Sequence, residues 1–288
     1  MGIMMNNSWR SRVSALIIGG MVLAGCTTQA ERIGADDGSD ACRSHKVALD
    51  STGNFFAEDM VKGAAVGAIG GALAGALIGG DLKSAAIGAA AGAALGAAGG
   101  YWQHLQQQEK DQAVLTRTVL SDLERENAQI DKSQLAFNQL IGCRKNEAKR
   151  IKNDLRANRI SRAVAEDRMD SLRQQFESDL KLARMIDENI EKRSENFLFA
   201  NEQLNPGTSD AVQEVGQQRA MVSAPKTGGS STKPRASQSG SRPQSVIKQA
   251  AKQPRVAEQT ASNIAKRTSY HNSVEVASTD ANQGFILS

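Results

Sequence analysis

The sequence predicts an all-α protein: a glycine-zipper helical hairpin, then long amphipathic helices that form an antiparallel helical hairpin or coiled-coil bundle, then a disordered tail. Three observations carry this prediction. No proline occurs before position 206, so long helices are unhindered over most of the chain. Glycine recurs at every fourth position in two stretches, a spacing that has structural meaning only on a helix. Aromatic residues make up only 4% of the 288 residues, which argues against an ordinary globular enzyme.

Residues 1–25 have the pattern of an export signal. Two arginines precede an apolar run at 13–23, which is too short for a confident membrane span. The run ends in LAGC, with the cysteine at position 26. This ending resembles the lipobox of bacterial lipoproteins. The resemblance implies that the chain is cut before Cys26, and that Cys26 is the lipidation site and carries acyl chains such as palmitate. The alternative is a plain signal peptide with a chance cysteine.

The same resemblance bears on location. Threonine rather than aspartate follows Cys26. By similarity to the enteric sorting rule, this implies the outer membrane, with the protein lipid-anchored on its periplasmic face. Membrane lipid is therefore an expected partner, and no cofactor is expected besides the covalent lipid. More than one acyl chain is what stable anchoring needs.

Residues 26–58 are interpreted as a polar tether. Cys42 lies in this segment, and the only other cysteine left after Cys26 is Cys143. An even pair of thiols in an oxidising compartment predicts a disulfide between them. The bond would close a loop of about a hundred residues, which the chain-entropy model values at about 4–5 kcal/mol. The alternative is two free thiols.

The glycine repeat occupies residues 59–101. Positions four apart advance about 40° beyond a full helical turn, so the glycines form one slowly winding groove. A groove without side chains lets another backbone approach closely. Gly80 can end the first arm and Ser84 can cap the second. The sequence therefore predicts a helical hairpin, with these packing positions: Gly63, Gly67, Gly71, Gly75, Gly79, Gly88, Gly92, Gly96 and Gly100.

Each arm of this hairpin would be roughly 25–30 Å long, close to the thickness of a hydrocarbon core. Three interpretations compete: a membrane-spanning hairpin, a soluble hairpin that oligomerises, and a low-complexity linker. The second arm holds only Ile87 and Leu95 as large apolar residues, and such weak hydrophobicity would let the segment pass the inner membrane during export. We expect membrane association of the hairpin and self-association into homo-oligomers.

The two arms and the following YWQHLQQQEKD resemble the glycine-zipper domain of bacterial outer-membrane lipoproteins. In that family the second arm runs into an aromatic residue and then a charged helix, and Tyr101 and Trp102 occupy this junction. Their rings are expected either at the membrane interface or as anchors in a helical core. Many such proteins continue into a peptidoglycan-binding domain. This chain has no strand pattern after the zipper, so that activity is not carried over.

Residues 102–204 are predicted to form the helical bundle. Apolar residues recur at three- and four-residue steps from Val119 to Phe197, which indicates amphipathic helices with a narrow seam. Asn127 and Gln134 interrupt this seam as polar positions that can set register.

The seam changes phase at residues 157–161. Asn158 is suited to a left-handed conformation and Ser161 to an N-cap, so these residues are predicted to be the tip of the antiparallel hairpin. The bundle is either contained in one chain or shared between protomers. Gly142 marks either a kink or a second break.

Residues 205–288 are predicted to be a disordered basic tail. The segment is rich in Ser, Gln, Gly, Pro and Lys, so it has little apolar surface with which to offset the entropy of ordering. Its basic residues could touch anionic lipid headgroups or cell-wall polymers. The alternative is a solvated spacer.

No catalytic set is recognisable in the chain. His45, His104 and His271 lie in different segments without metal-ligand spacing, so neither an enzyme nor a metal site is predicted. Basic residues are mostly mixed with acidic ones, and no nucleic-acid partner is expected. We expect a structural cell-envelope lipoprotein whose periplasmic helices contact an envelope protein or the cell wall. The alternative is an oligomeric, membrane-perturbing or conduit-forming accessory protein of an export or secretion apparatus.

Overall fold

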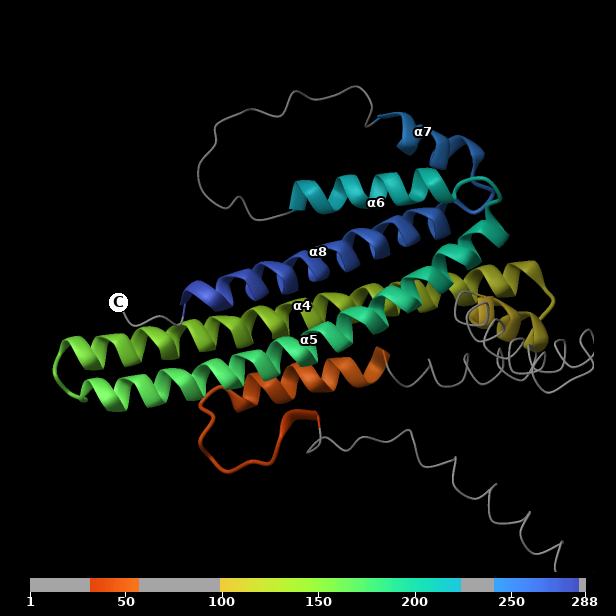
Figure 1. Cartoon of the computed structure of the whole chain (residues 1–288). Helices are drawn as coiled ribbons and strands as arrows, with labels where there is room; N and C mark the ends of the chain where they lie inside the picture. The colour runs from red at the N-terminus through yellow and green to blue at the C-terminus, as the bar shows by residue number, and fades with distance from the viewer. Residues whose placement is uncertain (1–31, 57–98, 224–240, 285–288) are drawn as a thin grey trace, which may run out of the picture.

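The computed structural model describes residues 32–56, 99–223 and 241–284, and every regular element in these ranges is a helix (Figure 1). The all-α prediction is therefore confirmed. The elements are α4 (Gln112–Arg156), α5 (Arg162–Leu204), α6 (Ser209–Ser223), α7 (Ser241–Ala250) and α8 (Pro254–Gly284). Residues 43–56 and 99–108 are helical as well. The signal segment, Cys26 and eight of the nine zipper glycines lie outside the described residues.

Helices α4 and α5 form a long antiparallel hairpin whose tip lies where the sequence predicts it. Asn158 takes a left-handed conformation with φ of 54°. Ser161 caps α5 by accepting a hydrogen bond from the amide of Val164 at 3.3 Å. Gly142 lies inside α4 and causes no break in the helix. The 45 residues of α4 give the hairpin a length of about 68 Å.

The prediction of a polar tether before the zipper is wrong for residues 32–56. This segment packs along α4 and α5 and places Cys42, Leu49 and Phe56 in the main core. These three apolar residues are seven positions apart, the repeat that keeps a side chain on one face of a packed helix. The polar residues between them concealed this sparse pattern. The main core of buried side chains also contains Phe137, Leu140, Met169, Phe176, Leu180, Ile186 and Ile190.

The prediction of a disordered tail is wrong for α6, α7 and α8. Helix α8 packs along both α4 and α5, and α6 packs along α8 (Figure 1). Most of the buried side chains of α8 are small, so composition alone underestimates how closely its backbone approaches its neighbours. They recur at helical spacing: Val256, Ala257, Thr260, Ala261, Asn263, Ile264, Tyr270, Val274 and Ala277.

The polar seam positions of α4 face α8 rather than another protomer. Asn127 donates to the carbonyl oxygen of Gln259 at 3.1 Å and to its side-chain oxygen at 2.9 Å. Gln134 donates to the hydroxyl of Ser273 at 3.0 Å. These residues therefore set the register of α8, a helix that the sequence pattern did not reveal.

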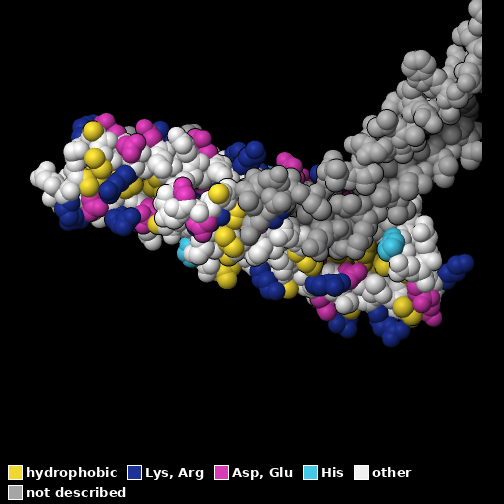
Figure 2. Space-filling model, turned by 90° about the horizontal axis from the view of Figure 1, so that it is seen from below, with side chains coloured by type: hydrophobic (Ala, Val, Ile, Leu, Met, Phe, Trp, Pro, Cys, Tyr) yellow, Lys and Arg dark blue, Asp and Glu magenta, His cyan; other side chains and the backbone are white. Residues whose placement is uncertain are grey.

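Basic residues of the predicted tail form ion pairs with acidic residues of the hairpin. Arg267 lies 3.1 Å from Glu191 and His271 lies 2.7 Å from Asp187, while Lys266 pairs with Asp131. These side chains therefore lie on the surface of the folded bundle and do not form a free basic tail. Over much of the face seen in Figure 2, basic and acidic side chains lie next to one another. Within the described ranges, no helix combines the length and hydropathy of a membrane span.

Candidate functional site: the zipper root and the disulfide lock

The described residues on either side of the zipper lie near one another along α5, in the half of the bundle away from the hairpin tip, and this region is here called the zipper root. It consists of Phe55, Phe56, Tyr101, Trp102, Glu126, Arg193 and Phe197. On the entry side, the Arg193 guanidinium carbon lies 5.0 Å from the centre of the Phe55 ring. On the exit side, a Cβ placed on Gly99 would lie 3.5 Å from the ring of Phe199. The contacts at Arg193 and Phe199 are six residues apart on α5, about 9 Å along its axis.

Arg193 holds the entry side of the zipper root through charge as well as stacking. Its Nη2 lies 2.6 Å from a carboxylate oxygen of Glu126, and its Nε donates to the same carboxylate at 2.9 and 3.0 Å. Glu126 is fully buried, and a buried carboxylate requires such a charged, multiply bonded partner. The guanidinium also faces the ring of Phe56 at 6.0 Å. Arg193 therefore joins α4, α5 and the helix that precedes the zipper.

Tyr101 and Trp102 hold the exit side. Trp102 is 5% exposed and packs in a cluster with Leu115, Val119 and Leu123 of α4. The Tyr101 hydroxyl donates to Asp122 at 2.8 Å, and the ring meets Phe197 edge-on at 5.2 Å between centres. Burial, followed by the charge of Asp122, raises the pKa of Tyr101, so the hydroxyl keeps its proton and remains a donor. Of the two alternatives for these rings, the structure supports the core anchor.

Gly100 is the one zipper glycine among the described residues. It is buried on the helix at 99–108, between Gly99 and the aromatic pair. The last glycine of the repeat therefore lies inside the bundle at the zipper root.

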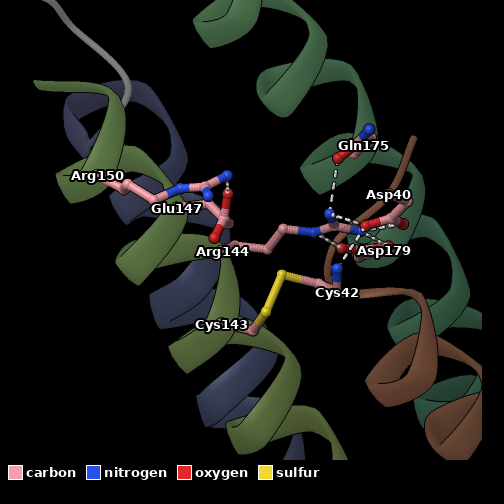
Figure 3. The surroundings of a disulfide bond; sticks show 8 residues. All are labelled: Asp40, Cys42, Cys143, Arg144, Glu147, Arg150, Gln175 and Asp179. Atoms are coloured by element: carbon pink, nitrogen blue, oxygen red, sulfur yellow. Dashed lines mark hydrogen bonds and ion pairs between the residues drawn. A yellow bond between two sulfur atoms is a disulfide. The ribbon is translucent and has the colours of Figure 1, made fainter. Parts of the chain in front are cut away.

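A second cluster, the disulfide lock, fixes residues 32–56 to the hairpin. It consists of Asp40, Cys42, Lys46, Cys143, Arg144 and Asp179. Cys42 and Cys143 are joined by a disulfide, the pair that the sequence predicts, with their Cα atoms 5.9 Å apart (Figure 3). Cys42 is fully buried. The bond closes a loop over a sequence separation of 101 residues that contains the whole zipper.

Arg144 is the centre of the lock and is fully buried. Its guanidinium donates to Asp40 at 2.5 and 2.8 Å and to Asp179 at 2.6 and 3.3 Å. A further hydrogen bond reaches the side-chain oxygen of Gln175 at 2.7 Å. The five hydrogen bonds use the full donor capacity of the arginine. Their acceptors lie in the segment before Cys42 and on α5.

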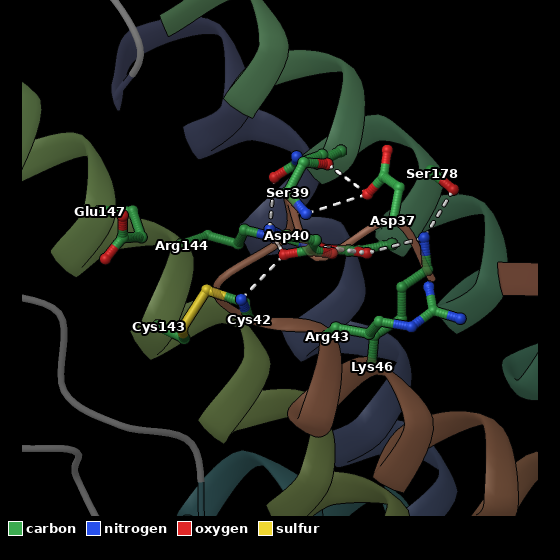
Figure 4. Close-up of polar contacts among 12 residues, drawn as sticks. Asp37, Ser39, Asp40, Cys42, Arg43, Lys46, Cys143, Arg144, Glu147 and Ser178 are labelled. Carbon is green, nitrogen blue, oxygen red and sulfur yellow. Dashed lines mark hydrogen bonds and ion pairs between the residues drawn. A yellow bond between two sulfur atoms is a disulfide. The ribbon is translucent and has the colours of Figure 1, made fainter. Parts of the chain in front are cut away.

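Lys46 completes the charge balance of the lock. Its ammonium lies 3.3 Å from Asp179 and donates to Ser178 at 2.9 Å (Figure 4). Two carboxylates are thus matched by two cations. Although partial burial opposes the shift, hydrogen bonds from Arg144 and from the Cys42 amide lower the pKa of Asp40. Burial raises the pKa of Asp179, while Arg144 and Lys46 act in the opposite direction.

Sequence reasoning missed Arg144, although a signal was present. Leu140, Ile141 and Ala148 are buried seam positions of α4, and Arg144 falls at the helical step between them. A charged residue at a seam position requires a buried partner. Which acids supply that partner could not be read from the sequence, because Asp40 and Asp179 are far away along the chain.

A third contact fixes the start of the described chain. The Arg32 guanidinium forms two hydrogen bonds to Asp50, at 2.7 and 2.9 Å, and Asp50 is almost fully buried. Arg32 follows Cys26 by only six residues. An extended segment of that length reaches at most about 20 Å.

The charged side chains in these clusters form ion pairs and hydrogen bonds with one another. Within the ranges that the structure describes, no three His, Cys, Asp or Glu side chains gather in a way that could hold a metal ion. His271 pairs with Asp187 and His104 contacts Gln108, each on the outside of the bundle. The chemistry of the site is therefore attachment: a covalent bond, buried ion pairs and stacked rings that hold both flanks of an insert.

Comparison with known proteins supports the reading of the insert itself. The Gly-zipper_Omp family, described as a glycine zipper, matches residues 61–107, which cover the glycine repeat and run through Tyr101 and Trp102. No curated protein and no solved structure gives a match. The chain therefore carries, at residues 61–107, a glycine-zipper domain of a family that is found in outer-membrane-associated proteins.

Proposed function

We propose that the protein is a structural lipoprotein of the outer membrane. Acyl chains at Cys26 and the glycine-zipper hairpin hold it at the bilayer, and the bundle is a rigid interaction module on the periplasmic side. One observation carries the proposal: the two flanks of the zipper are held close together on α5, at Arg193 and at Phe199, about 9 Å apart along the helix axis. A hairpin whose two arms lie side by side requires its ends to be close together, and an extended linker does not.

The position of Arg32 supports a shared membrane side for the lipid and the zipper. Asp50, which holds Arg32, precedes Phe56 by less than two helical turns, about 9 Å. The acyl chains and the zipper would therefore leave the bundle from neighbouring points. Two membrane signals acting together bind far more firmly than one.

The disulfide lock gives this arrangement a mechanical role. Residues 32–56 lie between the two membrane signals, and the lock bonds this segment covalently to α4. A force on the lipid anchor would then reach the bundle through a covalent bond and a buried ion cluster. Under this proposal the protein self-associates through its glycine grooves, and the bundle binds another protein of the cell envelope. The proposal includes no catalytic activity and no nucleic-acid binding.

Metabolic acyl labelling with membrane fractionation tests this function. Wild type should take up label and fractionate with the outer membrane, and Cys26→Ala should lose the label. Gly71→Leu with Gly75→Leu fills the groove, and together with Cys26→Ala it should release the protein from membranes. Gly142→Ala is the matched control, because a Cβ there meets nothing within 4 Å. Unlabelled, soluble wild type would overturn the proposal.

The same variants distinguish an anchor from a conduit. An anchor gives no ion leakage when wild type is reconstituted in vesicles. Leakage that disappears together with the oligomer in Gly71→Leu with Gly75→Leu would instead favour the conduit.

A further inference from the structure

The end of the α4–α5 hairpin at the turn between the two helices is rich in basic residues. The hairpin tip, residues 149–168, contains seven Lys and Arg against three Asp and Glu, so its excess of four positive charges equals the net charge of the whole chain. At the opposite end, residues 101–126 contain three basic and five acidic residues. Of the two ends of the α4–α5 hairpin, the tip is therefore the one with an excess of positive charge.

None of the other elements that the structure describes covers this tip. The ion pair nearest to the tip that α8 forms with the hairpin joins Asp280 to Lys145, before the tip begins. Figure 1 shows the turn between α4 and α5 extending past the end of α8 and past the helix at 43–56. The tip therefore projects as a two-helix finger at the end of a rod about 68 Å long.

The cations of the tip remain accessible to a partner. The side chains of Arg150, Arg159 and Arg162 are 65%, 62% and 76% exposed, although each lies beside an acidic residue. Ion pairs with this exposure are weak and give way readily to another anion. Lys149 and Arg168 are exposed too, and Val164 adds an apolar side chain that is 41% exposed.

We propose that the hairpin tip binds the surface of an anionic phospholipid bilayer. This inference rests on the proposed function, in which the acyl chains and the zipper are held in one membrane. The tip would then bind a second membrane. The basic side chains come from both helices and from the turn between them, and a flat anionic surface can contact them together. Basic residues beside an exposed apolar side chain are suited to a headgroup region. The protein would then bridge two membranes.

A vesicle-capture experiment tests the proposal with the full, lipidated chain. The protein is reconstituted in phosphatidylcholine vesicles, and flotation reports whether it is held there. Dye-labelled vesicles that contain phosphatidylglycerol are then added, and their capture is measured. Vesicles of phosphatidylcholine alone serve as the lipid control. Capture should decrease as salt is raised, because about 1 M salt shortens the screening length to about 3 Å.

The tip variant replaces Arg156, Arg159 and Arg162 with Gln. Each basic residue near an anionic surface strengthens binding by about fivefold, so the variant should bind about a hundredfold more weakly. The matched control replaces three exposed lysines of the shaft, Lys132, Lys181 and Lys192, with Gln, and should capture like wild type.

The outcomes separate this proposal from the proposed function. Protein that floats and captures anionic vesicles, with loss in the tip variant alone, supports the bridge. Protein that floats without capture, or equal losses in both variants, overturns the tip proposal only. Protein that does not float contradicts the proposed function, and direct binding of soluble protein to phosphatidylglycerol vesicles then tests the tip. Loss of co-sedimentation with isolated cell walls in the tip variant, without any vesicle capture, would assign the tip to a carboxylate polymer and overturn the lipid assignment.

Discussion

The α4–α5 hairpin is covered on its two sides by segments that are held in different ways. On one side, residues 32–56 contribute large apolar side chains, a disulfide and a buried ion cluster. On the other side, α8 contributes mostly small side chains, amide hydrogen bonds and ion pairs at the surface. The first cover leads directly into the zipper, whereas the second contacts its exit flank through Val256, which packs in the cluster that contains Trp102.

This difference indicates where strength is needed. A disulfide and buried charges resist separation even when the segment is pulled, whereas exposed ion pairs contribute little. The α8 side also retains unpaired polar atoms. In the part of the chain that the structure describes, Asn127 Oδ1 and Asn263 Nδ2 are buried and have no hydrogen-bond partner. Such atoms weaken an interface, so the α8 cover should be the less stable of the two.

The largest expected effect is loss of the disulfide. Cys42→Ser with Cys143→Ser should lower the free energy of unfolding by about 4–5 kcal/mol, because the loop that the bond closes is long. Denaturant unfolding of the mature chain measures this loss. Reduced wild type should match the double variant. Equal stability with and without reductant would show that residues 32–56 are held by packing alone.

Arg144→Met should lower the free energy of unfolding by about 3–5 kcal/mol, since it leaves the carboxylate of Asp179 buried without its main partner. Hydrogen exchange should then increase in residues 43–56 and stay unchanged in α8. Arg173→Met is the control, because Arg173 is an exposed arginine on α5. Equal exchange in both covers would contradict the separation between them.

Gly216→Ala tests the packing on the other side. A Cβ at this position would lie 2.7 Å from Cβ of Ile264 and 2.9 Å from the backbone oxygen of Ala261, so α6 and α8 would have to move apart. We expect a loss of about 1–3 kcal/mol in thermal or denaturant unfolding. Gly142→Ala, where nothing lies within 4 Å, should instead stabilise α4 by about 1 kcal/mol. A gain in the free energy of unfolding for both variants would show that α6 and α8 leave room for a methyl group at Gly216.

The smallest effect is expected at the surface ion pairs of α8. Lys266→Gln should change the free energy of unfolding by less than about 1 kcal/mol, and the change should shrink as salt is added. A loss comparable to that of Arg144→Met would mean that the α8 side is held as firmly as the locked side.

The sequence was sufficient for features that depend on local chemistry. Asn158 and Ser161 predicted the tip of the hairpin, because a left-handed residue and an N-cap are local preferences. The cysteine pair followed from counting the thiols that remain if the chain is exported and Cys26 is acylated. Segments that bury small or widely spaced apolar residues were missed, as residues 32–56 and α8 show. Their stability comes from partners distant in the sequence, such as Arg144 for Asp40 and Asn127 for Gln259.

The central claim is that the membrane lies at the zipper root and the hairpin tip lies far from it. Energy transfer from a fluorophore on the lipidated protein to a dye in phosphatidylcholine vesicles measures this directly. A fluorophore at exposed Gln106, on the helix that follows the zipper, should transfer efficiently, and one at Asn158, about 45 Å beyond Glu126 of the zipper root along the hairpin, should transfer little. Equal transfer from the two positions would place the whole rod along the bilayer and contradict the account.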